Sequence, residues 1–179
     1  VGAVYVSPVM FENQTPALAA LYDAIAQRGL AVGEIYAGDR LRVPDSSRWL
    51  VLHPPRRGVL GSDNANSLTL RADYAGRTIL LTGDLEPPGM DDLLAGEPIA
   101  CDVALAPHHG SSRSGQDEFL AWCRPEWVVI SAAANEGAAA VTASGNVGAR
   151  ALHTGQAGAV QVRLGVGGVE VRTWRREPW

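Results

Sequence analysis

Three residues with metal-binding side chains follow two apolar stretches of the sequence. Asp84 ends the stretch "RTILLTGD" (77–84), and His108 and His109 follow "DVALAP" (102–107). The chain has only four histidines, so an adjacent pair stands out. A carboxylate and imidazoles from neighbouring strand ends are ligand types that zinc, manganese or iron take. We therefore treat Asp84, His108 and His109 as candidate metal ligands, beside the plainer interpretation of a turn-forming aspartate and structural histidines.

Small residues surround these candidates. Gly83 and Gly110 permit tight turns beside the ligands because they carry no Cβ. Ser111 and Ser112 follow the histidines directly, and their hydroxyls can bond a substrate oxygen or orient a ligand. The pattern indicates a polar site formed by loops.

The elements that must position these residues are mostly strands. Segments 77–82 and 102–106 are largely apolar, which favours buried strands whose ends deliver polar residues to one edge of a sheet. Segment 66–74 alternates apolar and polar residues, and a turn at 74–77 joins it to the next strand. The remaining predicted strands are 3–7, 34–37, 49–54, 127–132, 159–166 and 169–174.

Helices are fewer and interspersed. Segment 15–29 has Thr15 as a cap, Pro16 at the first helical position and Gly29 at the end. Its apolar side chains fall on one face, which predicts that the helix covers a sheet; they are Leu18, Leu21, Tyr22 and Ile25. Short helices are predicted at 89–95 and after Ser114, and segment 133–149 is predicted to be a loop with at most one helical turn.

Composition places limits on the class of protein. A chain of 179 residues with 46% hydrophobic and 19% charged residues suits one globular domain, 1–179, and no apolar run reaches a membrane-spanning length. The start lacks an initiator Met, so we expect part of a longer protein. Net charge is −4, and all fifteen basic residues are arginine, which argues against a general nucleic-acid-binding surface but not against a metal-centred phosphate site. Cys101 and Cys123 lack CxxC spacing and are expected to be buried thiols.

Several motifs together resemble a known family. "NANSLTLRADYAGRTILLTGDLE", "CDVALAPHHGSSRS" and "FLAWCRPEWVVISAAANEG" follow one another, with "VLHPP" before them and "GAVQVRLGVGGVEVRTWR" after them. In this order they resemble the metallo-β-lactamase-like domain of ComEC-type competence proteins, over about residues 49 to 174. Soluble hydrolases of the same fold share the T-G-D and H-H-G motifs.

The resemblance implies an α/β fold, an αββα sandwich with metals at its rim, incomplete at its N-terminus here. Asp84 matches the metal-ligand aspartate, and His108 and His109 match the final histidine motif, with His109 favoured as the ligand and His108 as a ligand or phosphate contact. Asn64, Asn66 and Ser67 match a motif that either supports the turn and strand pairing or shapes the site.

Two expected motifs are missing from the chain. The main ligand motif of the superfamily, H-x-H-x-D-H, does not occur in it and is expected upstream. ComEC-type proteins often carry N-x-Y-G-H-P late in the domain, where this sequence reads "NEGAAAV" (135–141). His53 and His153 are interpreted as structural, with a position facing the site left open for His153.

The resemblance implies a function that depends on the intact site. It implies a metal-dependent hydrolase, a phosphodiesterase or nuclease with Asp84 and His109 as catalytic residues, using two divalent ions, zinc or manganese. The alternatives are a catalytically degenerate module that guides DNA, or a soluble hydrolase of another phosphodiester or an ester.

The resemblance also implies partners and a location. The partners would be single- or double-stranded DNA and an upstream membrane channel domain of the same polypeptide. This chain would then be a soluble domain of a bacterial inner-membrane protein, with the side of the membrane left open.

Overall fold

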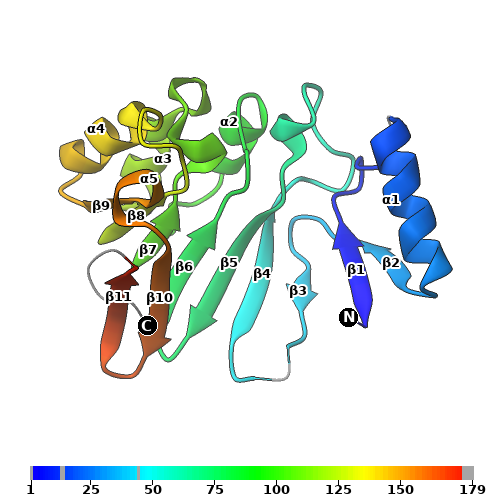
Figure 1. Cartoon of the computed structure of the whole chain (residues 1–179), viewed down its shortest axis with the longest axis horizontal. Coiled ribbons are helices and arrows are strands. Elements are labelled where there is room, and N and C mark those ends of the chain that lie inside the picture. Colours follow the sequence, from blue (N-terminus) through cyan, green and yellow to red (C-terminus); the bar gives the residue numbers. More distant parts are fainter. Residues whose placement is uncertain (1, 13–14, 44, 175–179) are drawn as a thin grey trace.

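The structure is a computed structural model that describes residues 2–12, 15–43 and 45–174. Its centre is a seven-stranded sheet, shown in Figure 1. Neighbours pair antiparallel from β3 to β6 and parallel from β6 to β9. The strands, in sheet order, are β3 (Arg40–Leu41), β4 (Arg48–His53), β5 (Thr69–Tyr74), β6 (Arg77–Leu81), β7 (Val103–Leu105), β8 (Trp127–Ile130) and β9 (Arg150–His153).

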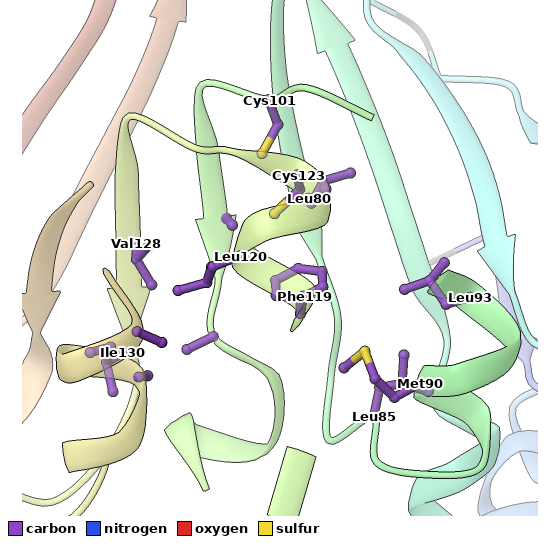
Figure 2. Close-up of a cluster of buried hydrophobic side chains, with 14 residues drawn as sticks. Leu80, Leu85, Met90, Leu93, Cys101, Phe119, Leu120, Cys123, Val128 and Ile130 are labelled. Atoms are coloured by element: carbon purple, nitrogen blue, oxygen red, sulfur yellow. The ribbon is translucent and has the colours of Figure 1, made fainter. Parts of the chain in front are cut away.

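Three helices connect the parallel strands and cover one face of that half of the sheet. They are α2 (Gly89–Leu94), α3 (Gln116–Cys123) and α4 (Ala138–Asn146). The register places Leu80, Ala104 and Val128 side by side on the covered face. Figure 2 shows Leu80 and Val128 with side chains of α2 and α3, including Met90, Leu93, Phe119 and Leu120. This packing forms the main core beneath the candidate site.

Smaller elements lie at both ends of the view in Figure 1. At one end, β1 (Ala3–Val6) pairs in parallel with β2 (Ala31–Glu34), and α1 (Pro16–Gln27) connects them. At the other end, α5 (Thr154–Ala157) precedes an antiparallel hairpin of β10 (Val160–Gly165) and β11 (Gly168–Thr173). Short 3-10 turns complete the order: η1 (Asn64–Asn66), η2 (Pro107–Gly110) and η3 (Ser112–Ser114).

Helix α1 begins as the sequence predicts but packs less than expected. The Thr15 hydroxyl accepts a hydrogen bond from the Leu18 N–H at 3.2 Å, and Pro16 is the first helical residue. Ile25 is buried, whereas Leu21 and Tyr22 are 42% and 52% exposed. The prediction that this apolar face covers a sheet is therefore wrong for most of the face within the described residues.

Other local predictions also need correction. Segment 133–149 contains the nine-residue helix α4, which the weak Ala/Gly pattern concealed. Helix α3 has Gly115 at its N-cap, and Ser114 is buried in the preceding turn. The second strand is 31–34, earlier than the predicted 34–37. Strand β9, at 150–153, was not predicted.

The α/β class is confirmed. The helices and the seven-stranded sheet correspond to one α layer and one β layer of the predicted αββα sandwich. The other described strands form two sheets of two strands each. Cys101 and Cys123 are buried and free, as expected. No described helix has the length and apolarity required to cross a bilayer.

Candidate functional site

Two loops that leave adjacent parallel strands place the predicted residues together. The loop after β6 carries Asp84, and the loop after β7 carries His108 and His109. Because β6 and β7 are parallel neighbours, both loops emerge at the same edge of the sheet. The His108 backbone N–H donates to the Gly83 carbonyl at 3.1 Å, which ties the two loops together. The predicted meeting of these residues at one edge is therefore present in the structure.

Asp84 and His109 face each other. His109 Nε2 lies 3.4 Å from Asp84 Oδ1, and both side chains are about half exposed, at 55% and 45%. The other ring nitrogen, Nδ1, lies 2.7 Å from the Ser131 carbonyl oxygen. A carbonyl only accepts, so Nδ1 carries the proton, and the lone pair of neutral His109 is on the nitrogen that faces Asp84.

His108 contacts a carboxylate that sequence reasoning missed. Its Nδ1 lies 3.3 Å from Glu86 Oε2, and the two side chains are only 20% and 17% exposed. The other Glu86 oxygen, Oε1, accepts a hydrogen bond from the Ser62 hydroxyl at 2.6 Å. Among the described residues, His108 Nδ1 has no hydrogen bond of good geometry, so Glu86 is its nearest polar partner. The only sequence signal for Glu86 was its place two residues after Asp84.

The histidine loop has an unusual backbone. His108 and His109 have φ values of 45° and 56°, in the left-handed region that non-glycine residues seldom adopt. Gly110 follows at 78°, and a Cβ there would lie 2.9 Å from the Ala140 Cβ and 3.0 Å from the Gly137 Cα. Two successive strained histidines persist only where the surroundings hold them, and such strain gathers at functional sites.

An open pocket of about 470 Å³ lies beside the histidines. It is lined by 108–112 and 135–139, which includes both predicted serines. The Ser111 hydroxyl accepts a hydrogen bond from the Arg113 N–H at 3.3 Å, whereas Ser112 is exposed. The segment beginning at Asn135, which lacks the family's late histidine, thus lies at the site.

The remaining histidines have different surroundings. His153 is buried, its Nδ1 accepts from the Gly155 N–H at 3.1 Å, and its Nε2 lies 2.9 Å from the Glu136 carbonyl oxygen. It therefore holds the loop that lines the pocket. His53 is fully buried, with Nδ1 3.1 Å from the Ser67 carbonyl oxygen, and burial lowers its pKa. Both occupy structural positions.

The motif at 64–67 supports the loops around the sheet. The Asn66 side chain accepts from the Val59 N–H at 2.8 Å and donates to the Val59 carbonyl at 3.0 Å. A Cβ on Gly83 would lie 3.4 Å from the Ser67 Cβ, so this motif also backs the turn that precedes Asp84. The structural interpretation of the motif thus accounts for Asn66.

Asp84, His108 and His109 do not form a complete metal site by themselves. Within residues 2–12, 15–43 and 45–174, no three or more His, Cys, Asp or Glu side chains are grouped so that they could hold a metal ion. What converges is one carboxylate oxygen and one imidazole nitrogen, beside a second histidine held by Glu86.

Comparison with known proteins gives three related sequences. ComE operon protein 3 of Bacillus subtilis is 35% identical over 113 residues, 63% of this chain and 14% of its own length. Competence protein ComA of Neisseria gonorrhoeae is 31% identical over 165 residues, 82% of this chain and 24% of its own length. Recombination protein 2 of Haemophilus influenzae is 32% identical over 87 residues, 46% of this chain and 11% of its own length. The chain thus spans about a quarter or less of these relatives.

The other comparisons add less. No family model matches the chain. A solved structure from Parabacteroides distasonis, provisionally named a metal-dependent hydrolase, overlaps 86% of this chain and 76% of its own with a TM-score of 0.48 and 12% identity. That overlap is too low to carry an assignment. From the sequence relatives, the chain belongs with the ComEC-type competence proteins and corresponds to a part of them.

Proposed function

We propose that this chain supplies half of a divalent-metal site that hydrolyses DNA phosphodiesters during DNA uptake. The observation that carries the proposal is the convergence of Asp84 and His109, 3.4 Å apart, from two adjacent strand ends. Both lie at one edge of the seven-stranded sheet, and relatives of the chain include a competence protein. We take 1–179 as one domain in this proposal. The strained backbone of the histidine loop supports a functional role for this edge.

The donor atoms suit zinc or manganese. Carboxylate oxygen and neutral imidazole nitrogen are ligands of both metals, and the Ser131 contact already fixes His109 in the tautomer that a metal requires. His108 is the second candidate ligand, since Glu86 faces its Nδ1 and leaves Nε2 for a ligand or a phosphate oxygen. Further ligands must come from outside the described residues, and two ions are the expected number.

Each residue has a separate role in the proposed reaction. A bound divalent metal would supply a Lewis acid that stabilises negative charge on the phosphate. Asp84 and His109 would hold it, and Ser112 would donate a hydrogen bond to a phosphate oxygen from the pocket wall. Ser111 would orient the loop through Arg113. An upstream membrane channel would deliver the DNA, with this chain as a soluble domain of an inner-membrane protein.

A second candidate is a DNA-guiding module without catalytic activity. It is favoured by the absence of a third metal ligand near Asp84 among the described residues. It is also favoured by "NEGAAAV" (135–141), which lacks the histidine of the N-x-Y-G-H-P motif. A soluble hydrolase of another phosphodiester or an ester would use the same residues and differ in its substrate.

The test is hydrolysis of fluorescently labelled single-stranded DNA by the complete natural protein, with manganese or zinc added. Asp84→Ala and His109→Ala should each lower the rate about 100-fold or more, because each removes a ligand. Asp23→Ala is the matched control, since Asp23 is exposed on α1. DNA binding without hydrolysis by the folded wild type would favour the guiding module, and hydrolysis by Asp84→Ala at the wild-type rate would refute the site.

A further inference from the structure

Four arginines gather in a second pocket, away from the histidine loop. The pocket has a volume of about 620 Å³ and lies at strands β3, β4 and β5. Its arginines are Arg40, Arg42, Arg48 and Arg71, and Asp73 is the single acidic residue that lines it. Such a concentration of positive charge is notable in a chain whose net charge is −4.

Strand pairing explains why the arginines share one face. Arg40 pairs with Leu50, Leu50 with Arg71, and Arg71 with Leu80. Directly paired residues on antiparallel strands point to the same side of a sheet. Arg48 lies two residues before Leu50 and joins them. This is the face that α2, α3 and α4 cover farther along the sheet, where Leu80 is buried.

Most of this positive charge is not neutralised. Arg71 donates two hydrogen bonds to Asp73, at 2.9 and 3.0 Å. Although burial opposes it, hydrogen bonds from Thr78 and Arg71 and the positive charges of Arg71 and Arg48 keep the pKa of Asp73 low, so this carboxylate is ionised. One carboxylate therefore faces four guanidinium groups in the pocket. In the described part of the chain, Arg40, Arg42 and Arg48 have neither an ion pair nor a side-chain hydrogen bond, and all three are exposed.

The arginine pocket is separate from the candidate metal site. Strand β6 runs from Arg77 to Leu81, and Asp84 follows its end. Arg48 pairs with Asp73, and Asp73 pairs with Thr78 at the start of β6. Arg48 is thus level with the start of β6, whereas Arg40 and Arg71 are level with Leu80 and are separated from Asp84 mainly across the sheet. Asp84 is not among the residues that line the arginine pocket.

We propose that this pocket binds the phosphate backbone of single-stranded DNA without a metal ion. Guanidinium groups bind phosphate oxygens in a bidentate manner. Within the described residues, Arg40, Arg42 and Arg48 form no ion pair or side-chain hydrogen bond that would compete with a phosphate. Proteins that bind single-stranded DNA hold its backbone in a positively charged groove. This pocket is such a hollow, lined by arginines at the β3 edge of the sheet. The proposal does not depend on catalysis at Asp84, because that residue lies in the loop after β6 and does not line the arginine pocket.

The experiment measures fluorescence anisotropy of a labelled oligothymidine with this chain in EDTA, over a range of salt concentrations. The triple variant Arg40→Ala/Arg42→Ala/Arg48→Ala should lose about tenfold or more in affinity at low salt. The slope of log affinity against log salt should fall by about 2, since each phosphate contact to a single strand contributes about 0.7.

A control triple variant removes the same charge elsewhere. Arg28→Ala/Arg163→Ala/Arg172→Ala changes exposed or Glu170-paired arginines and should bind within about twofold of wild type. Asp23→Ala, at an exposed position on α1, should bind as wild type does. Equal losses in the two triple variants, or no binding by the wild type at low salt, would overturn the proposal. So would binding to phosphatidylglycerol vesicles that the pocket variant abolishes while oligothymidine binding persists.

Discussion

Replacement of Gly110 by alanine tests how tightly the histidine loop is held. The new Cβ would lie 2.9 Å from the Ala140 Cβ, 3.0 Å from the Gly137 Cα and 3.2 Å from the Ile130 Cγ2. Two of these neighbours are core residues with no exposed surface, so they have little room to move. The φ of 78° adds left-handed strain for a residue with a side chain.

The magnitude follows from two separate contributions. Left-handed strain costs alanine about 1 kcal/mol, and overpacking in a close-packed interior costs about 1 to 3 kcal/mol. Gly110→Ala should therefore lower the free energy of unfolding by about 2 to 4 kcal/mol. Gly148→Ala is the matched control, because Gly148 has a φ of 72° but nothing within 4 Å of its added Cβ. It should lose only the strain contribution, about 1 kcal/mol.

Urea unfolding followed by tryptophan fluorescence measures both variants in one assay. The account requires Gly110→Ala to be the more destabilised by at least about 1 kcal/mol, with an unchanged dependence on urea. Equal losses would show that the loop is not packed against α4 and β8, and the positions given to His108 and His109 would then be wrong.

Three further predictions concern other residues. Glu86 Oε2 lies 3.3 Å from His108 Nδ1 and can only accept, so we expect this nitrogen to carry the proton. Glu86→Ala should then increase the Nε2–H form of His108 in ¹⁵N NMR spectra, while His109 stays Nδ1–H and His153 Nε2–H. An unchanged His108 would show that Glu86 does not set its tautomer. The free energy of unfolding should fall as pH falls below about 6.5, because burial lowers the pKa of His53 and the unfolded chain takes up the proton first. Urea unfolding of His53→Asn should show a smaller loss of this free energy between pH 7.5 and 5.5. A loss equal to that of the wild type would contradict this origin. Asn66→Ala should lower the free energy of unfolding in urea by about 1 to 3 kcal/mol, since it leaves both Val59 backbone groups without their partner. Asn135→Ala, at an exposed position, should lower it by under about 0.5 kcal/mol. Similar losses in the two variants would refute the structural role of Asn66.

The sequence predicted the parts of this fold that local chemistry determines. Thr15 and Pro16 start α1 as expected, because capping depends on a few adjacent residues. The apolar stretches before Asp84 and the histidines predicted two buried strands. These residues meet because the two strands, β6 and β7, are parallel neighbours whose ends lie at one edge of the sheet. The pattern therefore predicted that these residues meet, and the family resemblance was needed to favour a metal site over structural roles.

Features that depend on packing between distant segments were not predicted. Helix α4 has little amphipathic pattern, and it forms where Ala140 and Ala143 pack into the core. Glu86 lies near His108 because of the path of the loop between β6 and α2. Its position two residues after Asp84 does not by itself predict that contact. The arginine pocket needs the register of three strands, since Arg40 and Arg71 are 31 positions apart in sequence.

Metal content measured by mass spectrometry is the most direct test of the proposed site. The complete natural protein, purified from metal-replete medium, should retain zinc or manganese at about two ions per chain. Asp84→Ala should lose metal while remaining folded, and Asp23→Ala should keep it. If the folded wild type retains no metal, or if Asp84→Ala retains as much as the wild type, Asp84 and His109 do not form a metal site.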